Sequence, residues 1–142
     1  MRVALVVHDF DSNYGQGRYC VEIARRLRQH CEVSVYANTH KPSDLAEGIT
    51  VRHVRAARSH ASFTVFSFIP ASERMLKEDR PDIVHAQGLS CWHADVITGH
   101  ICNAARLLKM PRRPFRSSLF IRVVKPFEQA FYRQKQIGRA HV

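Results

Sequence analysis

The feature that most constrains the fold is an apolar segment near the start of the chain that leads directly into a glycine-containing loop. Residues 3–7 read Val-Ala-Leu-Val-Val, the pattern of a strand buried on both faces of a parallel sheet. The polar residues 9–17 follow, and apolar residues then recur at helical spacing over residues 20–27. Residues 32–36 alternate as a second strand does. This order of strand, loop, helix and strand is typical of a doubly wound α/β sheet.

The same alternation continues along the chain. Further apolar segments predict a strand, a helix and two more strands, at residues 49–54, 63–77, 83–86 and 95–98 in that order. Pro70 is expected either to kink this helix or to start its second part. Residues 87–94 separate the last two strands, whereas a parallel crossover usually needs about a dozen residues, so their pairing stays open. The predicted fold class is α/β: Rossmann-like, with a mostly parallel sheet and helices on both faces.

Composition agrees with an ordinary globular domain. The 142 residues are 45 % hydrophobic, which suits a packed core and is too high for a disordered chain. The run at 3–7 is too short to span a bilayer and lacks the flanks of a signal peptide, so we expect a cytoplasmic protein. The cysteines, Cys20, Cys31, Cys91 and Cys102, lack zinc-ligand spacing and are expected to be reduced and mostly buried.

The net charge of +10 is concentrated toward the C-terminal end. Between residues 106 and 135, nine basic residues stand against the single acid Glu128. Such a surplus attracts phosphates of lipid headgroups, nucleotides or nucleic acid. We expect no nucleic-acid partner, because the chain has no recognition motif and its aromatic residues stand at core spacing.

A final helix is predicted over residues 116–134, and Pro126 is expected to bend it. One face of this helix is apolar and is formed by Phe120, Val123, Val124, Phe127 and Phe131. Two interpretations stay open: a core-facing helix with a solvated basic face, or a helix that docks on an anionic membrane.

The glycine-containing loop is the first candidate site. Gly15, Gln16 and Gly17 lie between the first strand and the first helix, where backbone N–H groups and the helix dipole favour a phosphate or a sugar hydroxyl. A dinucleotide site is disfavoured, because Cys20 occupies the third glycine position of the fingerprint and the second strand ends without an acid. The alternative is a tight turn that binds nothing.

Two histidines form the second candidate site. His85, with Gln87 after it, lies at the carboxyl end of the strand at 83–86, and His100 follows the strand at 95–98. Ligands of open α/β sheets bind at this edge, so the histidines and the glycine loop should converge on one crevice. An imidazole there can hydrogen-bond sugar hydroxyls or a developing phosphate charge, although a histidine at a strand end is often purely structural.

These motifs together resemble the N-terminal domain of family-4 glycosyltransferases: an apolar strand, a G-x-G loop, then P-D-I-V-H-A at residues 81–86, then a strand ending in T-x-H at 98–100. The resemblance covers residues 2 to about 134. It implies a GT-B enzyme with two facing Rossmann-like domains that transfers a sugar from a nucleotide-sugar to a glycan or lipid-linked acceptor. It further implies retention of configuration and no metal or other cofactor.

The resemblance also implies roles for single residues. Gly15 and Gly17, with Gln16 between them, would approach the donor phosphate and the transferred sugar. His85 would face the acceptor, and His100 would reach the donor sugar, so these two are the candidate catalytic residues. Gln87 is a candidate substrate-binding residue at a position where family members often carry a second histidine.

The resemblance gives an expected domain organisation. Residues 1–135 would form the acceptor-side domain, with the C-terminal donor-binding domain outside this chain, so the chain alone is expected to be inactive and marginally stable. Residues 136–142 are expected to be a non-native tail, since Ile137–Val142 resembles a translated sequencing adapter. The alternative function is a stand-alone Rossmann-like module that binds a phosphorylated ligand without catalysis. The expected location is the cytoplasm, with possible docking on the inner face of the membrane.

Overall fold

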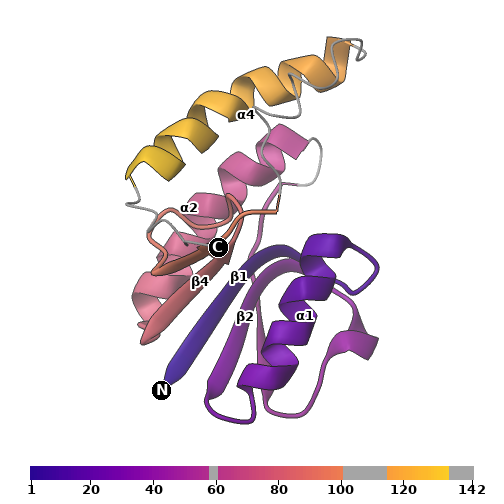
Figure 1. The fold of residues 1–142 in the computed structure, drawn as a ribbon, viewed down its shortest axis with the longest axis vertical. Coiled ribbons are helices and arrows are strands. Elements are labelled where there is room, and N and C mark those ends of the chain that lie inside the picture. The colour runs from indigo at the N-terminus through magenta and orange to yellow at the C-terminus, as the bar shows by residue number, and fades with distance from the viewer. Residues whose placement is uncertain (58–60, 101–114, 135–142) are drawn as a thin grey trace, which may run out of the picture. The chain divides into compact units, whose positions relative to one another are not determined.

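A computed structural model describes residues 1–57, 61–100 and 115–134, which divide into one unit over residues 1–100 and another over residues 101–142. The first unit is a five-stranded, fully parallel sheet in the order β3-β2-β1-β4-β5 (Figure 1). Its elements are, along the chain, β1 (Arg2–Phe10), α1 (Gly15–Leu27), β2 (Glu32–His40), η1 (Pro42–Asp44), β3 (Ile49–His53), α2 (Ala61–Asp79), β4 (Ile83–Gln87) and β5 (Val96–Thr98). The predicted α/β, Rossmann-like class is confirmed.

The two faces of the sheet carry separate cores because successive side chains of a strand point to opposite faces. Val3, Leu5 and Val7 of β1 pack with Cys20 and Ala24 of α1. Figure 1 shows α1 lying across β1 and β2 on that face. The apolar run at 3–7 is therefore fully buried, as its continuous pattern predicted.

The other face is covered by α2. Ala4 and Val6 of β1 pack with Phe68 and Leu76, both on α2. This helix is continuous and contains Pro70, so the proline does not start a separate helix. Helices therefore cover both faces of the sheet, as predicted.

The amino ends of the strands are tied to the end of α2. The Arg2 guanidinium donates hydrogen bonds to the carbonyl oxygens of Asp79 (3.2 Å) and Arg80 (2.6 Å), and the Arg2 backbone N–H donates to Asp82 Oδ2 (2.6 Å). The Tyr36 hydroxyl donates to Asp79 Oδ2 (2.7 Å). Arg80 has a left-handed φ of 46°, as is common for a residue that ends a helix. The contacts of Arg2 thus lie at the amino edge of the sheet, opposite to the candidate site, whereas Tyr36 reaches Asp79 from the middle of β2.

The pairing of β4 with β5, which the sequence left open, is parallel, with His85 opposite Val96 and Gln87 opposite Thr98. The connection between them contains no helix. Instead Asp95 bonds twice to Val84, through Oδ2 to its N–H (2.8 Å) and through its own N–H to the Val84 carbonyl (2.9 Å). These contacts hold the short connection without the packing of a crossover helix.

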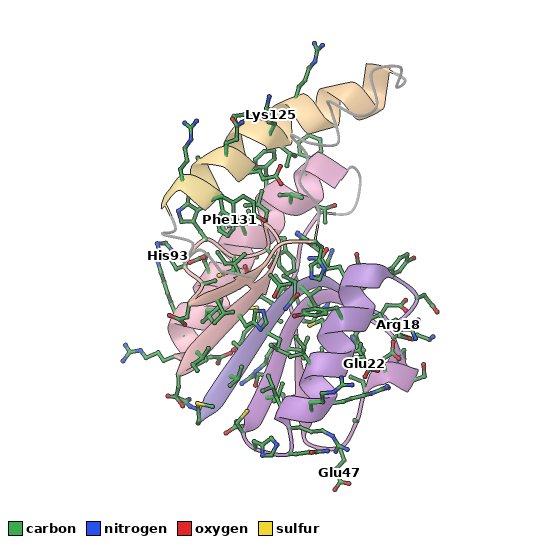
Figure 2. All side chains as sticks on the ribbon, viewed as in Figure 1. Arg18, Glu22, Glu47, His93, Lys125 and Phe131 are labelled. Atoms are coloured by element: carbon green, nitrogen blue, oxygen red, sulfur yellow. The ribbon has the colours of Figure 1, made fainter. Side chains whose placement is uncertain are left out.

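Glu73 of α2 holds the middle of this connection. Its Oε1 accepts hydrogen bonds from the backbone N–H groups of Trp92 (2.6 Å) and His93 (2.7 Å) and from Cys91 Sγ (3.1 Å). Its Oε2 contacts Nδ1 of His93 at 2.7 Å, and Figure 2 shows His93 on the connection. Burial alone would raise the pKa of Glu73, but the hydrogen bonds from His93 and Cys91 outweigh it and lower that pKa below its usual value. Glu73 is therefore an ionised anchor for the connection.

The second unit contains α4 (Phe115–Gln134), described here by itself. Val124, Glu128 and Phe131 are buried at helical spacing, whereas Phe127 is 45 % exposed. The buried face of α4 thus includes Val124 and Phe131 of the predicted apolar residues, whereas Phe127 lies at the edge of that face. The side chains of Phe120 and Val123 lie outside the described residues, as do Cys102 and the predicted tail at 136–142.

Candidate site at the carboxyl edge of the sheet

The carboxyl ends of β1 and β4 define the place where a ligand site is expected. These strands are neighbours, and the strand order reverses between them, since β2 and β3 lie beyond β1 while β5 lies beyond β4. In open α/β sheets the crevice at such a switch point is the usual binding site. The glycine loop follows β1, and the predicted polar residues follow β4 and β5.

The structure brings His85 and His100 together through Gln87. Nε2 of His85 lies 2.8 Å from the Thr98 hydroxyl and 3.2 Å from Nε2 of Gln87. The other end of the same amide, Oε1 of Gln87, lies 2.8 Å from Nε2 of His100. The Gln87 amide thus donates to His85 and accepts from His100. The residue that departs from the family pattern is the link between the two histidines.

Gln16 joins the glycine loop to this chain of hydrogen bonds. Its Nε2 donates to the Gln87 carbonyl oxygen at 2.5 Å. The next residue, Gly88, has a left-handed φ of 63°, and a Cβ there would lie 3.4 Å from Nε2 of Gln16. In this structure Gln16 therefore connects the start of α1 to the end of β4.

Gly15 and Gly17 have different surroundings although the sequence motif treats them alike. A Cβ on Gly17 would lie 2.7 Å from the Asp9 carbonyl oxygen, 2.9 Å from the Asp11 nitrogen, and closer still to the Asp11 carbonyl oxygen. In the part of the chain that the structure describes, a Cβ on Gly15 would meet no atom within 4 Å. Gly17 is thus required by the packing of its own chain, and Gly15 is the glycine whose surface is open to a ligand.

His8 is a site-edge residue that the sequence reasoning missed. Its Nε2 contacts the Leu89 carbonyl at 3.3 Å, and its ring packs on Phe68 with a centroid distance of 4.4 Å. Its Nδ1 is buried and has no hydrogen-bond partner among the described residues. The signal was available, because His8 lies near the end of an apolar strand, as His85 does.

All three histidines are held in the neutral form. Burial lowers the pKa of His8 and outweighs its contacts with Leu89 and Asp9. Burial, and then the proximity of His100, lower the pKa of His85, and burial lowers that of His100. A neutral imidazole both donates and accepts a hydrogen bond, which suits hydroxyl groups better than phosphate.

Acidification from pH 6.5 to about pH 5 is expected to destabilise the folded chain. Because these three pKa values lie below 6.5 in the folded chain, the unfolded chain binds more protons as the pH falls below 6.5. Urea denaturation at several pH values measures this slope, and His8→Phe should make it shallower while keeping a ring against Phe68. A slope unchanged by that substitution would contradict the role given to His8.

Comparison with known proteins agrees with the motifs. The sequence profile of Glycosyltransferase Family 4 matches residues 14–134, which include α1, all later strands and α4. The chain belongs to glycosyltransferase family 4. Among curated proteins none gives a significant match.

A solved structure places this family-4 chain in the GT-B class. The crystal structure of WaaG, a glycosyltransferase involved in lipopolysaccharide biosynthesis, superposes with a TM-score of 0.74 at 19 % sequence identity. The match covers 96 % of this chain and 36 % of the WaaG chain. The family-4 chain therefore has the Rossmann-like fold of a GT-B glycosyltransferase and spans about a third of the length of WaaG.

Proposed function

We propose that this chain is the acceptor-side domain of a retaining glycosyltransferase, which transfers a sugar from a nucleotide-sugar to a glycan or lipid-linked acceptor without a metal ion or other cofactor. His100 and the open surface at Gly15 would face the transferred sugar, and His85 and Gln87 the acceptor. WaaG is involved in lipopolysaccharide biosynthesis, which supports a cell-envelope glycan as the acceptor class.

The observation that carries this proposal is the neutral chain from Thr98 through His85 and Gln87 to His100 at the switch point. A run of linked, uncharged donors and acceptors matches the hydroxyl groups of a sugar. A module that binds a phosphorylated ligand would need a positively charged side chain at this place to bind the phosphate. The geometry therefore favours the transferase over the stand-alone phospholigand-binding alternative.

We place the enzyme in the cytoplasm, with contact to the anionic inner face of the membrane through α4. Arg122 and Arg133 are exposed on this helix, on the side opposite to Val124 and Phe131. In the described part of the chain no helix is long and apolar enough to cross a membrane. Co-sedimentation with vesicles containing anionic lipid, compared with neutral vesicles, tests the contact, and equal binding to both would contradict it.

Saccharide binding is the direct test of the proposed function. A core oligosaccharide from truncated lipopolysaccharide, added to the ¹⁵N-labelled chain, should shift amide signals at residues 15–17, 87–88 and 98–100. His100→Gln should weaken this binding about tenfold, the cost of one imperfect hydrogen bond in the site. His30→Gln, in the exposed turn that follows α1, is the matched control and should change nothing. Shifts confined to the amino edge, or equal effects of both substitutions, would refute the proposal.

Catalytic turnover by this chain is tested separately from saccharide binding. We expect no sugar transfer by the 142-residue chain alone, because the match to WaaG covers 36 % of that enzyme and the resemblance assigns donor binding to the other half. Release of nucleoside diphosphate from a nucleotide-sugar in the presence of the oligosaccharide measures this. Saccharide-dependent release by the purified chain would overturn the expectation.

A further inference from the structure

An exposed aromatic ring lies beside the polar chain and has no role in the function proposed so far. Tyr19, on the second turn of α1, is 41 % exposed. Its ring meets His100 edge to face, with a centroid distance of 5.0 Å and an interplanar angle of 73°. His100 is the outer end of the hydrogen-bonded chain that begins at Thr98. The ring therefore borders the same site.

The helix geometry leaves open space next to this ring. Residues four apart lie one above the other on a helix, and helical side chains lean toward the N-terminus, so Tyr19 leans toward Gly15. A Cβ on Gly15 would meet no atom of the described residues within 4 Å. The surface of the first turn of α1 at Gly15 is therefore open beside the Tyr19 ring. Arg18 and Glu22 also lie on α1, away from the buried face of the helix (Figure 2).

The chemistry of this arrangement suits a sugar ring. One face of a pyranose carries mainly C–H groups, which pack on an aromatic face, while its hydroxyl groups extend around the rim. A ring stacked on Tyr19 above Gly15 would bring its rim hydroxyls toward His100 and, behind it, Gln87. An aromatic side chain of this kind loses little conformational entropy on binding, because tyrosine has two flexible torsions.

Resting on the proposed function, we infer that Tyr19 is a specificity-determining stacking platform for a sugar ring, which it selects by the apolar face of that ring. Tyr14, which precedes α1, is more exposed, at 61 %, but no described ring contact joins it to the histidine chain. The Tyr19 ring would thus add to the hydrogen bonds a second recognition element, which distinguishes sugars by the orientation of their hydroxyl groups.

Saturation-transfer NMR tests the platform on the whole chain. With the core oligosaccharide, protons on one face of a single sugar ring should receive the strongest saturation and move upfield through the ring current of Tyr19. Tyr19→Phe keeps the ring and should keep this pattern within about twofold in affinity. Tyr19→Leu keeps apolar bulk without a π face and should weaken binding about tenfold or more and abolish the upfield shifts.

Two further probes identify which molecule supplies the sugar ring that stacks on Tyr19. UDP-glucose and UDP alone are added in parallel. Stronger signals from the oligosaccharide assign the platform to the acceptor, and stronger signals from the glucose protons of UDP-glucose assign it to the transferred sugar. Signals from UDP alone that disappear in Tyr19→Leu would mean base stacking and would overturn the inference.

The failure of the platform is distinguishable from the failure of the proposed function. Saccharide binding that Tyr19→Leu leaves unchanged would refute the platform and leave the acceptor-side proposal standing. Absence of saccharide binding by the unsubstituted chain would refute both. Far-UV circular dichroism of each variant verifies the fold, which an exposed position should tolerate.

Discussion

Replacing Gly17 by alanine is expected to destabilise the folded chain by about 3 kcal/mol, a cost typical of forcing an atom into a packed site. The new methyl group would overlap the backbone of Asp9 and Asp11, and backbone atoms cannot move aside as the end of a flexible side chain can. The loop before α1, or the first turn of α1, would have to shift. Because both belong to the packing of α1 on β1, the loss should appear in global unfolding.

Gly15→Ala is the matched control for this experiment. It adds the same methyl group two residues away, where none of the described residues lies within 4 Å, and it removes a flexible residue from a helix. We expect it to stabilise the chain by about 0.5–1 kcal/mol. Urea denaturation followed by circular dichroism compares the two variants, and the midpoint of Gly17→Ala should fall by about 2 M relative to that of Gly15→Ala. Equal midpoints would show that the two glycines are structurally equivalent.

Replacing Glu73 by alanine is expected to cost about 3 kcal/mol, because it leaves the N–H groups of Trp92 and His93 without their acceptor. The side chain is 14 % exposed, so water replaces the carboxylate poorly. Glu73→Gln keeps one acceptor oxygen and should cost about half as much. The order Ala, then Gln, then the unsubstituted chain is the expected ranking of stability from low to high.

The single tryptophan makes the Glu73 experiment specific for its region. Trp92 lies on the β4–β5 connection, so its fluorescence follows that connection, whereas circular dichroism follows the whole fold. In Glu73→Ala the fluorescence transition should precede the circular dichroism transition, because the connection opens first. The stabilisation by the Glu73 carboxylate should also begin to decrease below pH 4.5 and should vanish once the pH has fallen through the lowered pKa of the folded chain. Coincident transitions in this variant would contradict an anchoring role.

The order of the elements was predictable because buried parallel strands consist mainly of apolar residues. The positions at which these strands end were not predictable. β1 continues through His8 and Asp9 to Phe10, and β2 continues through Asn38 to His40, several residues beyond the apolar pattern. Polar residues occupy these ends because the strands finish at the site edge, so the hydrophobic signal stops before the strand does.

The other features that the sequence did not predict also depend on contacts between residues far apart in the chain. The connection that leads to β5 is held by hydrogen bonds that Glu73 and Asp95 accept from backbone N–H groups 11 to 20 residues away, and such contacts leave no periodic pattern in the sequence. The different roles of Gly15 and Gly17 depend on the course of the backbone at Asp9 and Asp11. For the candidate site, the sequence supplied His85, Gln87 and His100, and the structure supplied the order in which they are joined.

The contacts between the start of β1 and the end of α2 affect which residues of the chain can be substituted. Arg2 fastens the start of β1 to the end of α2 at Asp79 and Arg80, and Tyr36 reaches the same Asp79 from the middle of β2. Substitutions in the loops of the opposite edge can therefore accumulate without loosening this fastening. With Gly17 kept, an engineer could randomise the exposed residues 13–15, 18 and 19 together with residues 98–100, and would vary recognition without touching the contacts of Arg2.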